Sequence, residues 1–250
     1  MNGMNDFEIE NGVLVKYTGA ESRVEIPSSV VSIADFAFKG CSCVRSVVIP
    51  ASVNSIGHYA IADCCALEEL AVNEGNRKYC SRGNCVIDKQ ENTLVLGCQS
   101  SVIPDDGSVT DIERFAFASC VSLESIIIPG TVKQIRDYAF DGCYNLDSVT
   151  IIGSVNPEVY WHGPLDYIGS HAFAGCERLD CIVIPQSVSC IGDKAFFECK
   201  NLKSVTVSDS LDFIGIDAFG GCNEALVICA PKDSYAEEYA KENGIKVKTI

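Results

Sequence analysis

Cysteine is the reactive residue type that stands out in this sequence: 15 of the 250 residues are cysteine, whereas only three are histidine. Thiolates bind zinc, attack electrophiles and form disulfides. Seven cysteines recur at regular spacing, at Cys41, Cys64, Cys120, Cys143, Cys176, Cys199 and Cys222. A small apolar thiol suits a tight buried turn and can bond weakly to a backbone carbonyl. We expect these seven to be reduced thiols in the core. Disulfides between them are the alternative, but cysteines at equivalent positions of stacked repeats have parallel Cα–Cβ bonds, and this geometry disfavours a disulfide.

The other eight cysteines offer a second chemistry, since Cys80, Cys85 and Cys98 lie close together in the sequence and could bind zinc or oxidise. The sequence contains no Cys-x-x-Cys pair, and no histidine lies near these three, so we expect no metal and no cofactor. His58 and His171 occupy a position that holds polar residues in other repeats, and we expect neither to be catalytic. No G-x-S-x-G, P-loop or H-E-x-x-H motif occurs. The sequence therefore predicts no enzyme.

Charge excludes further classes of function. The chain has 34 acidic and 19 basic residues, for a net charge of −15. A nucleic-acid phosphate backbone requires a basic surface, so nucleic acid is excluded as a partner, and the same charge disfavours an anionic membrane surface. No apolar run reaches the ~18–20 residues that span a bilayer, which excludes membrane insertion. Residues 1–10 are acidic and do not resemble a signal peptide.

An internal repeat positions the cysteines. Pairs of alanine and phenylalanine begin at Ala37, Ala116, Ala139, Ala172, Ala195 and Ala218, and Ala60 fits the series with Ile61 in place of phenylalanine. Successive spacings are 23, 56, 23, 33, 23 and 23 residues, so a 23-residue unit recurs with insertions in two places. The regularly spaced cysteine follows each aromatic position by three residues, and apolar residues two apart follow in turn.

Alternating apolar residues indicate a short strand with one buried face, and the proline that often follows ends it. A 23-residue unit cannot bury this face alone, but stacking each unit on the next makes a continuous core. The sequence therefore predicts a β-rich, right-handed solenoid in which the phenylalanines lie over one another along one axis.

The unit L-x-S-V-x-I-P-x-S-V-x-x-I-x-x-x-A-F-x-x-C, as in Leu123 to Cys143 and Leu179 to Cys199, resembles the BspA-like leucine-rich repeat of bacterial and protozoan surface proteins. The resemblance covers nearly the whole chain, from about Phe7 onward. It implies a leucine-rich-repeat superhelix, a loose association with adhesion and protein recognition, and a cell-surface or secreted location, with no active site to carry over. The many free cysteines favour a cytoplasmic location as the alternative.

We expect a single domain over residues 1–250. Residues 1–23 form an N-terminal cap hairpin, with strands near 13–17 and 24–26, and residues 24–69 form the first two repeats. An irregular repeat at 70–101 carries a hairpin with strands near 84–88 and 93–97. The remaining repeats cover 102–229, with an insertion at 153–164, and residues 230–250 form a C-terminal cap. The cap contains a helix over Ser234 to Asn243 that ends at Gly244.

Two surfaces are candidate partner sites. The residues between the apolar pairs point outward by the period of two and form an uncharged column, Val48, Val102, Ile127, Thr150, Val183 and Thr206, beside a column of serines. Exposed apolar surface often marks an interface, although strand propensity alone would give the same residues. The insertion carries Tyr160, Trp161 and His162, and aromatic residues of this kind are typical of interface hot spots. The alternative is that Trp161 packs back onto its own repeat.

Three hypotheses follow. The first is a non-catalytic, monomeric interaction or adhesion module for a protein or glycan partner. The second is a structural spacer of a longer surface protein. The third is a metal protein or enzyme that uses Cys80, Cys85 and Cys98.

Overall fold

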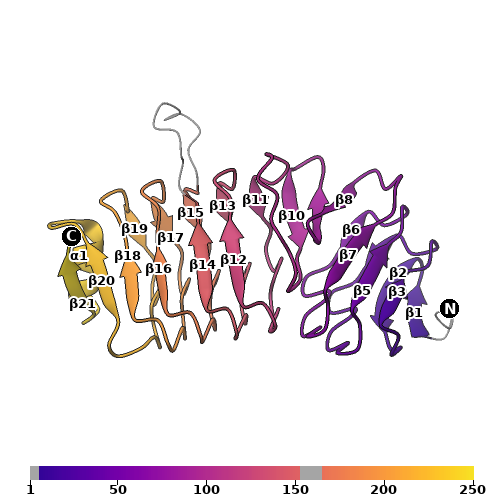
Figure 1. Ribbon diagram of the computed structural model, residues 1–250, viewed down its shortest axis with the longest axis horizontal. Helices are drawn as coiled ribbons and strands as arrows, with labels where there is room; N and C mark the ends of the chain where they lie inside the picture. Colours follow the sequence, from indigo (N-terminus) through magenta and orange to yellow (C-terminus); the bar gives the residue numbers. More distant parts are fainter. Residues whose placement is uncertain (1–5, 153–164) are drawn as a thin grey trace.

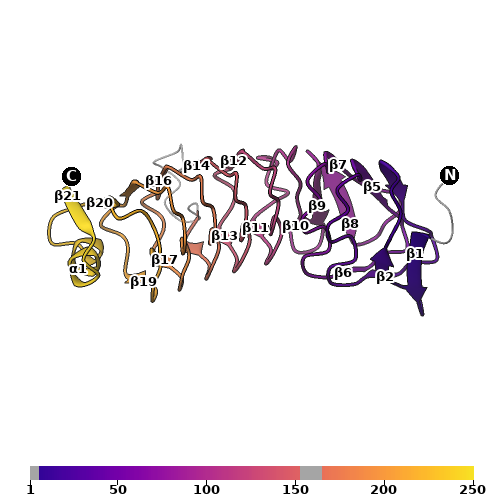
Figure 2. The ribbon, with the colours of Figure 1, turned by 90° about the horizontal axis from the view of Figure 1, so that it is seen from below.

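The chain forms a β-solenoid, as the repeat predicts. The computed structural model describes residues 6–152 and 165–250. Short strands from successive turns lie side by side, and two rows of strands run along opposite sides of the rod (Figures 1 and 2). The N-terminus lies at one end of the rod, and the one helix of the described residues closes the other (Figure 1).

The strands predicted from the V-x-I pairs form the first row, which we call the face row. Its members are β3 (Arg23–Glu25), β5 (Ser46–Ile49), β7 (Glu69–Val72), β12 (Ser125–Ile128), β14 (Ser148–Ile151), β16 (Cys181–Val183), β18 (Ser204–Thr206), β20 (Val227–Ala230) and β21 (Lys246–Thr249). They hydrogen-bond in parallel as β3-β5-β7, β12-β14 and β16-β18-β20-β21. The 23-residue register is retained, so that Ile126 lies opposite Val149.

The second row, which we call the back row, holds two sheets. The first is β1 (Phe7–Glu10), β2 (Val13–Tyr17), β4 (Ser32–Ile33) and β6 (Ser55–Ile56). The second is β8 (Tyr79–Arg82), β9 (Cys85–Asp88), β10 (Thr93–Leu96), β11 (Asp111–Ile112), β13 (Gln134–Ile135), β15 (Tyr167–Ile168), β17 (Cys190–Ile191) and β19 (Phe213–Ile214). No hydrogen-bonded pairing of strands joins β6 to β8 among these residues, so the back row is interrupted where the sequence repeat is interrupted.

The core is a column of stacked aromatic rings. The rings of Phe117, Phe140, Phe173, Phe196 and Phe219 follow one another at centroid distances of 4.8, 5.0, 5.4 and 5.4 Å, within 9° of parallel. Phe140, Phe173 and Phe196 have no exposed surface. Tyr17 and Phe38 form a separate aromatic pair at 5.4 Å in the core of the first turns. The predicted stacking of equivalent side chains is confirmed.

The N-terminal hairpin lies one strand earlier than the sequence predicted. Strand β2 pairs antiparallel with β1, not with the strand at residues 23–25, and β3 instead pairs in parallel with β5. The turn at Asn11 and Gly12 supplies two positive φ angles, as a tight hairpin requires. The inserted hairpin is confirmed as antiparallel β9 and β10, and β8 adds a third strand that the sequence did not predict.

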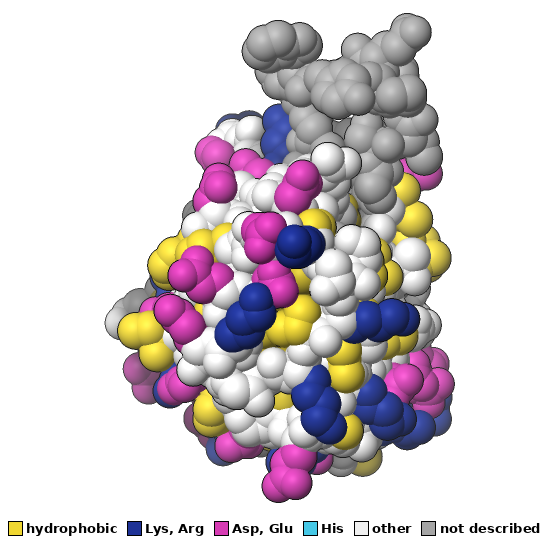
Figure 3. All heavy atoms as spheres, turned by 90° about the vertical axis from the view of Figure 1, so that its left-hand side faces the viewer, with side chains coloured by type: hydrophobic (Ala, Val, Ile, Leu, Met, Phe, Trp, Pro, Cys, Tyr) yellow, Lys and Arg dark blue, Asp and Glu magenta, His cyan; other side chains and the backbone are white. Residues whose placement is uncertain are grey.

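Helix α1 (Tyr235–Glu242) closes the C-terminal end. Ser234 is its N-cap, and Gly244 follows its end with a φ of +68°. Ala236, Tyr239 and Ala240 are buried, and the Tyr239 ring meets Phe219 edge-on at 6.2 Å. Tyr235 does not share this buried face and is 40% exposed. Lys246 and Lys248 are exposed on edge strand β21, and charged side chains are interspersed over this end of the rod (Figure 3). Edge lysines discourage pairing with another strand.

The cap gives a pH-dependence prediction. Glu237 accepts a hydrogen bond from the Asp233 amide at 2.6 Å, and Ser234 Oγ accepts one from the Glu237 amide at 3.3 Å, which together form a capping box. Two hydrogen bonds, the first from the Lys241 side chain and the second from the Asp233 amide, lower the pKa of Glu237 below its ordinary value. The ionised carboxylate therefore stabilises the cap above the unfolded pKa, and this contribution is lost as the pH falls through the lower folded pKa.

We expect the amide protection factors of α1 to fall on acidification more steeply in the wild type than in Glu237→Gln. Hydrogen exchange followed by mass spectrometry measures this. Equal pH dependence in the two proteins would show that the capping carboxylate has no role.

Candidate functional site

The face row presents an exposed apolar column. Ile127 and Val183 expose 60% and 63% of their surface, although they lie in the middle of β12 and at the end of β16. Their register neighbours Thr150 and Thr206 are exposed and half-buried, respectively. The four residues form what we call the face patch: Ile127, Thr150, Val183 and Thr206. The predicted outward orientation holds for these positions.

The prediction that Val48 is exposed is wrong, because Val48 is only 8% exposed. Its register neighbours are Glu25 and Ala71, in the central strand of the β3-β5-β7 sheet. Arg23 pairs with Glu25 at 3.3 Å and reaches across to Glu69 at 3.8 Å. The Arg23–Glu69 pair crosses β5 at Ser46, and Glu25 lies beside Val48 in the register, so charged side chains flank this position and the face patch does not continue into the first turns.

Val102 is the most exposed of the predicted column at 71%, but it lies outside any strand. Its N–H donates to the carbonyl of Gly83 at 2.7 Å, which ties it to the turn of the β8–β9 hairpin. Val102 therefore lies beside the β8–β9 turn of the back row and belongs to no sheet of the face row. Tyr160, Trp161 and His162, the other predicted partner residues, lie outside the described residues.

An acidic margin borders the face patch. Glu124, Asp147 and Asp180 directly precede the strands β12, β14 and β16 and are all exposed. Lys203 occupies the equivalent position before β18 and pairs with Asp180 at 2.6 Å. Between these charges and the patch lie Ser125 and Ser148, both exposed. The arrangement is an apolar strip with hydroxyl groups and carboxylates along one side.

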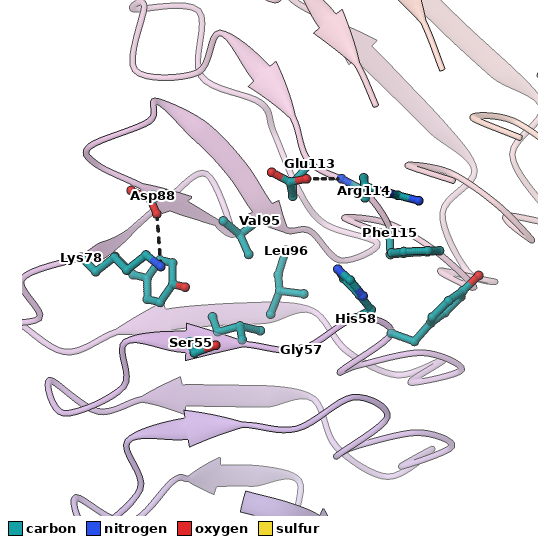
Figure 4. Close-up of a pocket in the computed structure, with 13 residues that line it drawn as sticks. Ser55, Gly57, His58, Lys78, Asp88, Val95, Leu96, Glu113, Arg114 and Phe115 are labelled. Atoms are coloured by element: carbon teal, nitrogen blue, oxygen red, sulfur yellow. Dashed lines mark hydrogen bonds and ion pairs between the residues drawn. The ribbon is translucent and has the colours of Figure 1, made fainter. Parts of the chain in front are cut away.

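A second feature, which the sequence analysis missed, is a cleft of about 220 Å³ at the interruption of the back row. Its lining comes from β6 and the residues after it, from the three strands of the hairpin repeat, and from the segment after β11. The polar and aromatic members include Ser55, His58, Lys78, Asp88, Glu113 and Phe115 (Figure 4). The signal in the sequence is the 56-residue gap between Ala60 and Ala116, where one repeat lacks its alanine–aromatic pair.

The charges around the cleft are mostly compensated. Lys78 lies 3.7 Å from the buried Asp88 and also over the ring of Tyr79. Glu113 accepts a hydrogen bond from the Arg114 amide at 3.0 Å and another from Arg136 at 2.7 Å. Burial raises the pKa of Tyr79, so its hydroxyl is protonated at neutral pH. The cleft is therefore polar and close to neutral, within a strongly acidic chain.

A ladder of aromatic rings is formed by the residues that directly precede five of the repeat alanines, Ala37, Ala60, Ala116, Ala139 and Ala172. It runs through Phe36, Tyr59, Phe115, Tyr138 and His171, with centroid distances of 4.5–5.2 Å. Each of these residues has a positive φ, between 52° and 62°. Their ring faces lie against one another, so the ladder has structural rather than ligand-binding geometry. His58 and His171 pack on Phe115 and Tyr138, respectively.

The repeated cysteines form a ladder of thiols. The Sγ of Cys64, Cys143, Cys199 and Cys222 donates to the carbonyl of the aromatic residue one turn earlier, at 3.0–3.2 Å. This is the weak bond that the sequence predicted. Burial raises the pKa of Cys143 and Cys176, which keeps both as thiols. All fifteen cysteines are free.

The geometry does not assemble the proposed zinc site. Cys80 and Cys85 both pack with the core of the later turns, whereas Cys98 packs with the core of the first turns, and Cys85 and Cys98 bond to backbone carbonyls. Burial raises the pKa of Cys85 to about 12, which disfavours the thiolate that a metal needs. Within residues 6–152 and 165–250 no group of three or more histidine, cysteine or acidic side chains is placed to hold a metal ion.

A rod of stacked 23-residue turns with one exposed strand row is the architecture of a leucine-rich repeat protein. A family model described as the BspA type leucine rich repeat region matches residues 9–83, 97–225 and 166–250. The chain belongs to this family, which is typical of bacterial surface proteins and is commonly non-enzymatic.

Solved structures agree with this assignment. The chain is 27% identical to a leucine rich cell surface protein from Faecalibacterium prausnitzii, with a TM-score of 0.66 over 90% of this chain and 56% of that one. It thus spans only about half of that protein. The pneumococcal vaccine antigen PcpA shares the fold at 15% identity, with a TM-score of 0.63 over 93% of this chain and 69% of that one. The sequence has no significant match among curated proteins. Within the described residues, no helix has the length and hydropathy needed to cross a bilayer.

Proposed function

We propose that the chain is a non-catalytic recognition module of a cell-surface protein, and that the face patch binds a protein partner. The observation that carries the proposal is the exposure of Ile127 and Val183, 60% and 63%, in neighbouring parts of one strand row. Contiguous exposed apolar surface is rare on soluble proteins without an interaction role. The similar solved structure is described as a cell surface protein, which supports the location.

The surroundings of the patch favour one kind of partner. Glu124, Asp147 and Asp180 border it, and the chain carries a net charge of −15. A matching protein surface has an apolar centre with lysine or arginine on one side, since complementary charges speed association and suppress wrong partners. A glycan is a weaker match, because glycans stack on exposed aromatic faces and the face patch contains only aliphatic and hydroxyl side chains.

The test compares two double variants. Ile127→Lys with Val183→Lys places two charges in the face patch. Val31→Lys with Ile216→Lys is the matched control, with the same residue types and added charge at exposed positions outside the face row, 43% and 74% exposed. A protein captured from host or neighbouring-cell extracts on the immobilised wild type is purified, and its affinity for each variant is measured by biolayer interferometry.

We expect the patch variant to weaken binding at least tenfold, the control to bind as the wild type does, and association to slow as salt rises. Equal binding to both variants would contradict the assignment of the face patch. A structural spacer predicts no saturable protein ligand at all, and purified glycans that compete with the captured protein would indicate a glycan partner instead.

A further inference from the structure

The interruption of the back row gives this rod a site that a regular repeat would not have. Strand β6 ends one sheet and β8 begins the next. In a regular repeat the back-row strand is followed by a tight turn, the corner, which leads into the alanine–aromatic pair, and the hairpin repeat lacks this turn. The corner after β6 therefore packs directly on the corner after β11: Tyr59 meets Phe115 at 4.5 Å, and the Asp63 amide donates to Ser119 at 3.2 Å. The cleft of about 220 Å³ lies beneath this bridge, between segments that lie up to 60 residues apart in the sequence.

The walls of the cleft carry polar atoms that their neighbours leave free. Among the described residues, the Ser55 hydroxyl and the His58 imidazole have no hydrogen bond within the chain, while the Lys78 amine lies 3.7 Å from Asp88 and interacts with the Tyr79 hydroxyl. Asp88 and Glu113 supply carboxylate oxygens with lone pairs to spare. Val95 and Leu96 supply an apolar surface between these polar groups (Figure 4).

Donors, acceptors and an apolar surface in one small space define the ligand. Hydroxyl groups both donate and accept, so a ligand rich in hydroxyls can use the amine, the imidazole and both carboxylates together. Its apolar face would lie against Val95 and Leu96. The volume is below the roughly 300–1,000 Å³ of pockets for larger ligands, so the space fits one ring. We propose that the cleft binds one neutral hexose in its pyranose form.

Charge excludes the neighbouring classes of ligand. An anion of the same size would face Asp88 and Glu113 within a chain of net charge −15. A cation would face Lys78 and Arg114. A neutral sugar avoids both conflicts. This proposal is independent of the face patch, which lies on the opposite row of strands (Figure 2).

The experiment is saturation-transfer NMR and calorimetry on the full chain, with free glucose, galactose, mannose and N-acetylglucosamine, their methyl glycosides, and oligosaccharides ending in each. Ser55→Trp fills the cleft from an exposed position. Ser148→Trp is its matched control, since Ser148 is also an exposed serine at the first position of a short strand. Glu113→Gln, with Glu124→Gln as its control, removes one carboxylate with little change in shape and serves if Ser55→Trp fails to fold.

We expect one neutral hexose to bind with millimolar affinity, and Ser55→Trp or Glu113→Gln to weaken it at least tenfold while both controls bind normally. Binding of the free sugar identifies a nutrient or signal, and binding only of oligosaccharides identifies a terminal residue of a glycan. The proposal is overturned if no neutral hexose binds, if an acidic sugar such as N-acetylneuraminic acid binds in its place, or if the cleft variants and their controls weaken binding equally.

Discussion

Phe140→Ala is expected to lower the free energy of unfolding by about 3–5 kcal/mol, the range for deleting a buried phenylalanine. The Phe140 ring is fully buried and stacks on Phe117 at 4.8 Å and on Phe173 at 5.0 Å. The backbones of the turns on either side are held by strand pairing, as in β13 with β11 and β15, so the column cannot collapse into the space. A cavity therefore remains in the middle of the rod.

Denaturant unfolding followed by circular dichroism measures this change. Phe213→Ala is the matched control, because the Phe213 side chain is 47% exposed in β19, and we expect it to cost no more than about 0.5–1 kcal/mol. Comparable losses in the two variants would mean that the column is not the main source of stability.

Gly97→Ala is expected to cost up to about 3 kcal/mol, the upper range for overpacking a core. Gly97 occupies the place in the hairpin repeat where other repeats carry the aromatic residue, since its N–H donates to Ala116 as that of Phe38 donates to Ala60. A Cβ at Gly97 would lie 2.0 Å from Cε1 and 2.2 Å from Cζ of Phe117. The Phe117 ring has taken the space that the missing side chain leaves, so even one methyl group cannot be accommodated.

A double-mutant cycle distinguishes this clash from a backbone effect. Phe117→Leu removes the two ring atoms that the new methyl group would meet, so we expect Gly97→Ala to cost at least 1 kcal/mol less in that background. Strictly additive effects would show that Phe117 is not what excludes a side chain at this position.

Much of the fold is predictable from the sequence because equivalent positions of successive repeats stack on one another, so the spacing of the repeats predicts which residues are in contact. The spacing of Phe117, Phe140 and Phe173 predicts their column, and the alternation around Ile126 and Ile128 predicts both the strand and its buried side. The helix of the C-terminal cap is predicted to within one residue at each end, because Ser234 and Gly244 are strong capping signals.

The exceptions arise where contacts between repeats override the period. Val48 follows the outward pattern, yet it is buried in the central strand β5, between Glu25 and Ala71 and near the Arg23–Glu69 ion pair, which joins side chains two repeats apart. The cleft depends on which sheet the hairpin strands join, since β8, β9 and β10 continue the sheet of β11 and leave β6 without a partner beyond it. The sequence marks this interruption only by a missing alanine–aromatic pair, and nothing in it locates Glu113 opposite Ser55.

The central claim is that equivalent side chains from successive turns lie over one another along one axis, and nuclear Overhauser contacts between the phenylalanine rings test it most directly. With ring protons observed in selectively labelled protein, we predict that Phe140 contacts Phe117 and Phe173, and that Phe196 contacts Phe173 and Phe219, across 23 to 33 residues of sequence. Rings that show no contact with these partners, or that contact phenylalanines two or more turns away, would contradict the stacked architecture and with it the face patch and the cleft.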